Sequence, residues 1–387
     1  MRELTAEEID WIAEGASVLG TGGGGSPYQA ALALRRAMRR GRSVRVLDPD
    51  ELSDDSIGPV LCGMGAPTVG LERLLTAGRY GALARAAEAL VGRAMDFIVI
   101  SEIGGGNALV PLLAAAESGL PVVDADANGR ALPELSMNTF AIAGLRLSPL
   151  LLDDGKSTLA ALSGLPDAAT AERYARALTW AMGGSAGLVS GVRSGSEVRR
   201  HAIPRMLGVA RAIGRAMALG RQQKLPPAEA LTRAVPGAVH LFHGKVVDVA
   251  RTTALGFARG TLRLEGTDGD RGRSARVEFQ NEYLIARVDD GLSVKTVLTA
   301  PDLLVLIERE SGLALSTERL RYGLRLAMLG LPAPAELKTE AALRSVGPRA
   351  FGYDEPFRPL AGDLARDVTI DEDPSNRTSA ALGRRIG

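Results

Sequence analysis

Acidic residues follow two predicted strands in the first half of the chain. Glu102 comes directly after a continuous apolar run at residues 95–101, and Asp124 and Asp126 follow a second short run at 121–123. Alternation along an extended segment points Asp124 and Asp126 to the same side, where each carboxylate shifts the pKa of the other. Because ligands of open α/β sheets bind beyond the carboxyl ends of the strands, the pattern predicts an acid–base site at this edge.

Other polar residues close to these strands extend the predicted site. The residues predicted to be catalytic are Glu102, Asp124, Asp126 and Glu134, and those predicted to bind the substrate are Gly22, Gly23, Gly24, Asn107, Arg130 and Asn138. Two of them have simpler interpretations, because Asn107 could only cap a helix and Arg130 could neutralise neighbouring acids in a solvated loop. Asp124, Asp126 and Glu134 could also bridge a divalent metal ion, since hard cations prefer carboxylate oxygens. Among these acidic residues a divalent metal ion is therefore a possible cofactor, and none is certain.

A glycine-rich segment near the N-terminus could bind an anion or a dinucleotide. Gly20, Gly22 and Gly25 satisfy the spacing G-x-G-x-x-G between a short apolar segment, 16–19, predicted to be a strand, and a following helix. Asp48 closes the next predicted strand, at the distance where an acid would bind a ribose. The alternative is a backbone loop with positive φ angles whose amides approach an anionic ligand.

Length and composition exclude several classes of protein. The chain has 387 residues, enough for two domains, and its 46 Lys and Arg balance 45 Asp and Glu to a formal charge of +1. This balance gives no electrostatic argument for binding nucleic acid or an anionic membrane. The N-terminus is typical of a capped amphipathic helix, not a secretory signal, and no apolar run reaches transmembrane length. We therefore expect a cytoplasmic protein.

Cysteine and histidine positions exclude further chemistry. A single cysteine, Cys62, allows no internal disulfide, and its apolar surroundings predict a core residue. The histidines are His201, His240 and His243, all outside the first half, which removes a Ser-His-Asp triad from the glycine-rich region. On a strand, the spacing of His240 and His243 would point their rings to opposite faces, against a shared metal.

The order of predicted elements indicates an α/β N-terminal domain with glycine-rich strand-to-helix loops and a β-rich C-terminal domain. We assign 1–165 to the α/β domain, 166–362 to a helical connection and the β-rich domain, and 363–387 to a loosely ordered tail. The helices predicted in the connection are 168–182, 204–220 and 226–234, and strands separated by glycine and aspartate turns follow from 239.

Several short segments carry a family resemblance. In order along the chain they are 20–27 (GTGGGGSP), 62–67 (CGMGAP), 102–107 (EIGGGN), 124–134 (DADANGRALPE), 244–245 (GK), 281–282 (NE) and 347–353 (GPRAFGY). Together, over about residues 5–360, they resemble the S-methyl thiohydantoin desulfurase family. The resemblance implies an N-terminal α/β domain and a C-terminal β-rich domain acting on a thiohydantoin or hydantoin-type ring.

Three functions follow as hypotheses. The preferred one is a hydrolase that releases methanethiol from an S-methyl thiohydantoin, a small-molecule substrate. The second is a dinucleotide-dependent oxidoreductase, which rests on the glycine loop and Asp48. The third is a non-catalytic subunit of a hydantoinase complex with a hydantoinase-like partner. Because exposed sheet edges need covering, we also expect a homo-oligomer.

Overall fold

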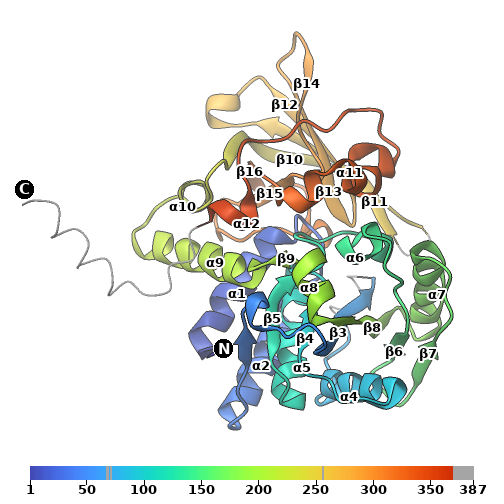
Figure 1. The fold of residues 1–387 in the computed structure, drawn as a ribbon. Helices are drawn as coiled ribbons and strands as arrows, with labels where there is room; N and C mark the ends of the chain where they lie inside the picture. Colours follow the sequence, from blue (N-terminus) through green and yellow to red (C-terminus); the bar gives the residue numbers. More distant parts are fainter. Residues whose placement is uncertain (67–68, 70–71, 255–256, 369–387) are drawn as a thin grey trace, which may run out of the picture.

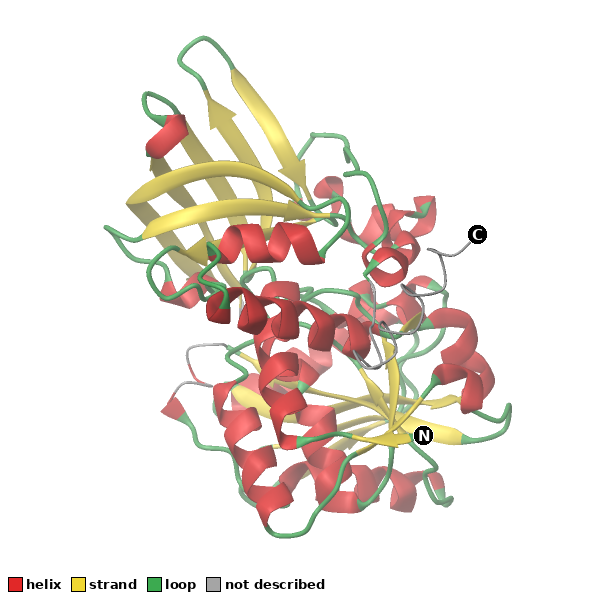
Figure 2. Ribbon diagram, turned by 90° about the vertical axis from the view of Figure 1, so that its left-hand side faces the viewer, coloured by secondary structure: helices red, strands yellow, loops and turns green. Residues whose placement is uncertain are grey.

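Two β-sheets organise the chain, a mixed sheet and an antiparallel sheet (Figure 1). The computed structural model describes residues 1–66, 69, 72–254 and 257–368. The antiparallel sheet stands above the mixed sheet in Figure 1, and Figure 2 shows helices lying between the two. The predicted fold class, an α/β part followed by a β-rich part, is confirmed.

The first sheet contains the parallel strands that position the site. Its order is β1 (Arg2–Glu3), β2 (Arg45–Leu47), β5 (Val122–Asp126), β4 (Ile98–Ile100), β3 (Ile57–Gly65), β8 (Ser185–Ser194), β6 (Leu150–Asp153) and β7 (Leu159–Leu162), and β9 (Ile203–Pro204) pairs with β5. Strands β2, β5, β4 and β3 are mutually parallel, and β1, β8, β6, β7 and β9 are antiparallel to their neighbours. The carboxyl ends of β3, β4 and β5 therefore meet at one edge.

Helices cover both faces of this sheet. They are α1 (Ala6–Leu19), α2 (Tyr28–Arg39), α4 (Arg79–Val91), α5 (Val110–Ser118), α6 (Thr139–Ile142), α7 (Ala168–Ala181), α8 (Gly195–His201) and α9 (Met206–Gln222). Alternate residues of β4 belong to different cores, with Ile98 and Ile100 in the cluster that includes α1, α2 and α5 and Val99 in the cluster that includes α6 and α8. Burial on both faces explains why this strand is a continuous apolar run.

The second sheet is wholly antiparallel. Its order is β14 (Val294–Thr299), β13 (Glu282–Asp289), β12 (Ser274–Gln280), β11 (Phe257–Gly266), β10 (Val239–Ala254), β16 (Arg325–Leu331) and β15 (Leu303–Glu308). The remaining helices are α10 (Pro227–Ala234), α11 (Glu340–Val346) and α12 (Leu364–Asp367). In the described part of the chain, no helix is both long and apolar enough to cross a membrane.

The first glycine-rich loop connects two helices, so the predicted strand at 16–19 is wrong. Helix α1 starts at a capping box of Thr5 and Glu8 and continues to Leu19, with Gly20 as its C-cap. Ala16, Val18 and Leu19 are buried near the end of this helix. The second glycine loop, which follows β4, does lead from a strand into a helical segment, η2 (Gly105–Ala108).

Two segments pack differently from the predicted domain division. Residues 185–194, assigned to a helical connection, form β8 between β3 and β6 of the first sheet. Their many Gly, Ser and Ala residues have low strand propensity, which hid the strand. The predicted tail also begins too early, because Leu364 and Val368 are buried in the first core. Residues 369–387 lie outside the described part of the chain.

The two histidines of β10 lie beside each other, contrary to the predicted opposite faces. The pairing of β10 with β16 shifts register between His240 and Phe242. A β-bulge inserts one residue and so reverses the alternation of side chains beyond it. The ring centroids of His240 and His243 are consequently 4.0 Å apart.

Candidate active site

A cavity of about 480 Å³ lies at the carboxyl ends of β3, β4 and β5, the edge at which the sequence predicts a site. Its polar lining residues come from both sheets, and they are Ser26, Tyr28, Gln29, Cys62, Tyr80, Ser101, Glu102, Asn107, Asn128, Glu134, Asn138, Arg176, Ser185, Asn281 and Glu282. Six of them follow β4 or β5 in the chain, whereas Asn281 lies in the turn between β12 and β13 and Glu282 begins β13. The cavity thus belongs to both domains.

Glu102 is a buried carboxylate held by three N–H donors. The side-chain amide of Asn107 donates to Oε1 (3.0 Å), and the side-chain amide of Asn128 (3.2 Å) and the backbone N–H of Leu132 (3.0 Å) donate to Oε2. Burial raises the pKa of Glu102 to about 7, although these donors and nearby Arg130 oppose the shift. A carboxyl group that titrates near neutral pH is suited to general base catalysis.

Asn107 positions Glu102 instead of capping a helix. Its side-chain oxygen accepts a hydrogen bond from the backbone N–H of Gly63 (2.9 Å) while its amide donates to Glu102. No side-chain cap is present at η2 or α5. Asn107 therefore ties the loop after β4 to strand β3 and orients the carboxylate.

Glu282 is the second buried carboxyl group of the cavity, and the sequence analysis did not select it. Burial and the nearby carboxylate of Glu102 raise the pKa of Glu282 well above its usual range, although Arg130 opposes the shift. A raised pKa favours the protonated form, in which Glu282 can donate a proton. The cavity therefore combines a carboxyl group with a pKa near 7 and a second one whose pKa is raised by burial and by the first.

Three buried polar atoms of the cavity residues have no protein partner. They are Asn128 Oδ1, Asn138 Nδ2 and Glu282 Oε2. Asn138 caps α6 through its side-chain oxygen, which accepts from Ala141 N–H at 2.8 Å, and this bond leaves the amide group as a donor. Buried polar atoms normally find a partner, so one donor and two oxygens in one cavity suggest a polar ligand.

Arg176 supplies the cation of the cavity as far as its lining is described. It extends from α7, donates to Glu172 (2.5 Å) and to the carbonyl of Pro133 (3.0 Å), and stacks 4.2 Å from the ring of Phe257. Arg176 is not among the predicted site residues, because it lies more than thirty positions beyond the last of them, Asn138.

Glu134 and Cys62 also line the cavity. Glu134 is partly exposed, and its carboxylate accepts from the hydroxyl of Ser136 at 3.2 Å. Cys62 packs in an apolar cluster, as predicted, and burial raises the pKa of its thiol to about 12. The thiol thus stays neutral and is a poor nucleophile.

Asp126 holds the backbone below the cavity and does not face into it. Its Oδ1 accepts from the backbone N–H groups of Ile103 (3.0 Å) and Asn128 (2.9 Å), and its Oδ2 accepts from that of Gly129 (2.6 Å). These bonds tie the loop after β4 to the loop after β5. The predicted catalytic role is therefore replaced by a structural one.

Asp124 caps a helix that begins 80 residues later in the chain. Its carboxylate accepts from the backbone N–H groups of Leu207 (2.8 Å) and Gly208 (3.1 Å), in the first turn of α9. An acidic side chain at this position satisfies otherwise unpaired donors. The expectation that Asp124 and Asp126 face one pocket is wrong, because backbone groups from different loops engage each carboxylate.

The predicted metal set does not assemble. Asp124 and Asp126 accept hydrogen bonds from backbone N–H groups, while Glu134 lies in the cavity wall. Within the described ranges no cluster of three or more His, Cys, Asp or Glu side chains could hold a metal ion.

Arg130 connects the two domains and does not reach the cavity. Its fully buried guanidinium donates to the carbonyl oxygens of Pro301, Asp302 and Tyr283, each at 3.0 Å, and to the hydroxyl of Thr21 at 2.5 Å. These partners belong to the second sheet region and to the first glycine loop. The prediction that Arg130 binds the substrate is therefore wrong.

The glycines of the first loop permit close packing, and one of the three predicted ligand-binding glycines lines the cavity. Gly22 lies against the ring of Tyr283, and Gly23 lies against the carboxylate of Glu282. Gly24 lines the cavity and packs on the second glycine loop, where a Cβ would lie 2.2 Å from the carbonyl oxygen of Gly104. Backbone packed on backbone thus explains much of the glycine content.

The dinucleotide fingerprint is not formed. No strand precedes the loop, and Asp48 lies in a different environment, where it caps the short helix η1 (Pro49–Glu51). Both carboxylate oxygens of Asp48 also accept hydrogen bonds from Arg205. The acid that would bind a ribose is therefore engaged elsewhere.

Comparisons with known proteins agree with this architecture. The family model of the S-Me-THD-like N-terminal domain matches residues 7–163, and that of the S-Me-THD-like C-terminal domain matches residues 166–360. A crystal structure of a protein from Chromobacterium violaceum is similar with a TM-score of 0.79 and 27% sequence identity, over 93% of this chain and 100% of that one. No curated protein matches the chain.

Proposed function

The chain belongs to the S-Me-THD-like family, and from this premise we propose that it hydrolyses an S-methyl thiohydantoin, releasing methanethiol and leaving a hydantoin. The observation that carries the proposal is the pair of buried carboxyl groups in one cavity, Glu102 and Glu282. We assign Glu102, whose pKa lies near 7, as the base that activates water, and Glu282, whose pKa burial and Glu102 raise, as the acid that protonates the ring.

The reaction requires water to add to the ring carbon that carries the methylthio group. Glu102 removes a proton from the water as its oxygen bonds to this carbon, and the adjacent ring nitrogen takes the proton of Glu282. When the tetrahedral centre collapses, the C–S bond breaks and the departing thiolate takes the proton held by Glu102. The hydroxyl proton returns to Glu282, so both groups regain their starting states.

Two asparagines are suited to hold the ring. A thiohydantoin ring presents a carbonyl oxygen beside a ring nitrogen, and the unpartnered Asn138 Nδ2 and Asn128 Oδ1 supply a donor and an acceptor for such an edge. Both atoms are buried, so a ligand that lacks these groups would leave them unpaired. An unpaired buried polar group costs about 1–3 kcal/mol.

The test measures methanethiol and hydantoin formation from an S-methyl thiohydantoin. We expect Glu102→Gln and Glu282→Gln each to lower kcat by roughly a hundredfold or more, the scale for losing a general base or acid. Glu134→Gln is the matched comparison, because Glu134 lines the same cavity but is partly exposed, and we expect a loss of less than about tenfold. Full turnover by either of the first two variants would overturn the assignment.

A further inference from the structure

A second hollow, of about 860 Å³, lies beside the cavity, between α2 and α4, and its wall is rich in arginine. Five exposed arginines line it, and they are Arg36, Arg39, Arg40, Arg42 and Arg85. We call this hollow the basic groove. Its positive charge is local, because the whole chain has a formal charge of only +1.

The arginines of the basic groove are unpaired. Within the part of the chain that is described, none of the five makes an ion pair or a side-chain hydrogen bond, whereas Arg35, their neighbour on α2, pairs with Asp10 at 2.7 Å. The acidic residue of the described lining, Glu117, makes no ion pair with them and offsets only one of their five charges. Its two carboxylate oxygens accept from the backbone N–H groups of Gly78 (2.7 Å) and Gly81 (2.9 Å). The described lining of the basic groove therefore carries a net positive charge.

The basic groove is continuous with the cavity. Gln29, Leu32, Leu74 and Leu75 line both hollows. Helix α2 runs from the cavity into the basic groove, and a rise of about 1.5 Å per residue places the backbone of Arg36 about 6 Å beyond Leu32 along the helix axis, with Arg40 at the C-cap. Arg36 is thus the first arginine along α2 that a substituent extending from the cavity would meet.

We propose that the basic groove binds the carboxylate of a short side chain carried by the substrate ring, so that the enzyme acts on rings derived from acidic amino acids. The proposal rests on the proposed function for the position of the ring. Guanidinium groups recognise carboxylates through paired hydrogen bonds, and several of them at one wall concentrate an anionic ligand there. The cavity binds the ring itself, and the basic groove selects its substituent.

Binding to the intact chain tests the proposal without requiring turnover. The probes are the hydantoin of glutamic acid and the uncharged hydantoin of glutamine, measured by calorimetry. We expect the carboxylate probe to bind about tenfold more tightly than the amide, and added salt to reduce this difference because the arginines are exposed. In the variant Arg36→Gln/Arg40→Gln the preference should disappear while affinity for the amide probe stays unchanged.

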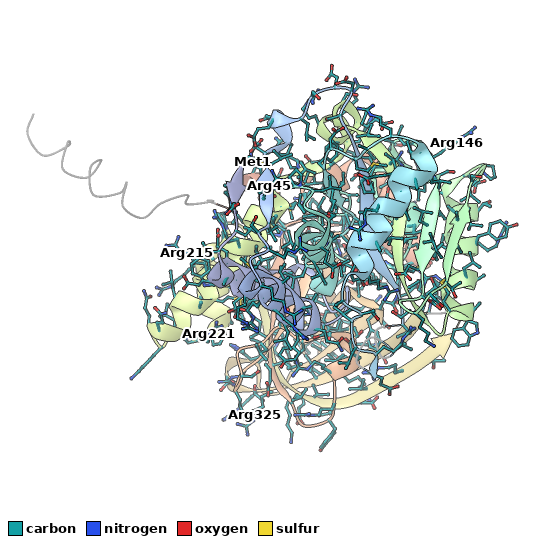
Figure 3. The ribbon with its side chains drawn as sticks, turned by 90° about the horizontal axis from the view of Figure 1, so that it is seen from below. Met1, Arg45, Arg146, Arg215, Arg221 and Arg325 are labelled. Carbon is teal, nitrogen blue, oxygen red and sulfur yellow. The ribbon has the colours of Figure 1, made fainter. Side chains whose placement is uncertain are left out.

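Arg321→Gln/Arg325→Gln is the matched control, since it removes two exposed arginines of the second sheet region without touching the basic groove. Figure 3 shows Arg325 at the margin of the molecule. Equal binding of the two probes by the wild type, or an equal loss in both double variants, would overturn the proposal. If the wild type binds the carboxylate probe selectively but hydrolyses no S-methyl thiohydantoin, the proposed reaction is wrong, whereas the proposed role of the basic groove in binding a carboxylate is retained.

Discussion

Substituting alanine for Gly23 should lower kcat by displacing Glu282, the proposed proton donor. Gly23 does not have a positive φ angle, so its backbone accepts a Cβ atom. That Cβ would lie 2.0 Å from Oε1 of Glu282, 2.6 Å from Cδ and 2.7 Å from Cγ. The variant therefore acts on one functional side chain with a single added carbon.

The size of the displacement follows from these distances. Ordinary contact begins near 3.4 Å, so the carboxyl oxygen must move by roughly 3.4 − 2.0 = 1.4 Å. A misplacement of about 1 Å in a catalytic group can cost about a hundredfold in rate. Overpacking a buried site costs about 1–3 kcal/mol in stability, which most folded domains survive. We therefore expect Gly23→Ala to fold and to lose about a hundredfold in kcat.

A double-mutant cycle separates this mechanism from a general loss of structure. Glu282→Asp withdraws the carboxyl group by one methylene, about 1.5 Å, and makes room for the new Cβ. In that background Gly23→Ala should lower kcat by less than about threefold, because the two changes act on the same contact. Circular dichroism and urea unfolding verify that each variant folds. Wild-type kcat in Gly23→Ala, or losses that simply multiply in the double variant, would refute the reasoning.

Three further predictions concern buried ionisable groups. The pKa of Glu102 in the folded protein, about 7, lies above the usual value of 4.5, so its contribution to stability is complete below pH 4.5 and is lost as the pH rises through 7. Urea unfolding at several pH values should show that the free energy of unfolding of the wild type falls by up to about 3 kcal/mol over this pH range, and that Glu102→Gln lacks this fall. Over the same range kcat/KM of the wild type should rise through pH 7. Asp126→Asn should lower the free energy of unfolding by at least about 2 kcal/mol, because one amide oxygen cannot accept from three backbone N–H groups, and an unchanged Tm would contradict this. Arg130→Met should cost about 4 kcal/mol by leaving three interdomain carbonyl groups unpaired, and a loss below about 1 kcal/mol in the same unfolding assay would count against that role.

The sequence predicted the position of the site but only part of its chemistry. Apolar runs that end in polar residues identify the carboxyl ends of β4 and β5, and Glu102 does line the cavity at this edge. The roles of Asp124 and Asp126 depend on N–H donors from other loops and from α9, which no local pattern reveals. Spacing along the chain therefore predicts where the carboxylates lie relative to the strands, but it does not show which N–H groups donate hydrogen bonds to them.

Glu282 shows what is missing from a local analysis. It lies 180 residues beyond Glu102, and only the packing of the second sheet on the first brings both to one cavity. One signal was present, because the pair at 281–282 is among the segments of the family resemblance. The structure adds a physical reason, since Asn281 adopts a φ of 58° in the turn that presents Glu282.

Strand β8 has a consequence for how the chain is made. It is the link between β3 and the hairpin of β6 and β7, yet it lies beyond residues 7–163, which the N-terminal family model matches. During synthesis β6 and β7 cannot join the first sheet until β8, which ends at residue 194, has left the ribosome. Until then β3 pairs with β4 alone and lacks its second partner, which lies at least 120 residues away. A gene cut near residue 165 should yield two fragments that aggregate when expressed separately, because each exposes unpaired strand edges. The same fragments should associate when they are produced together, because β8 of the second fragment pairs with β3 and β6 of the first.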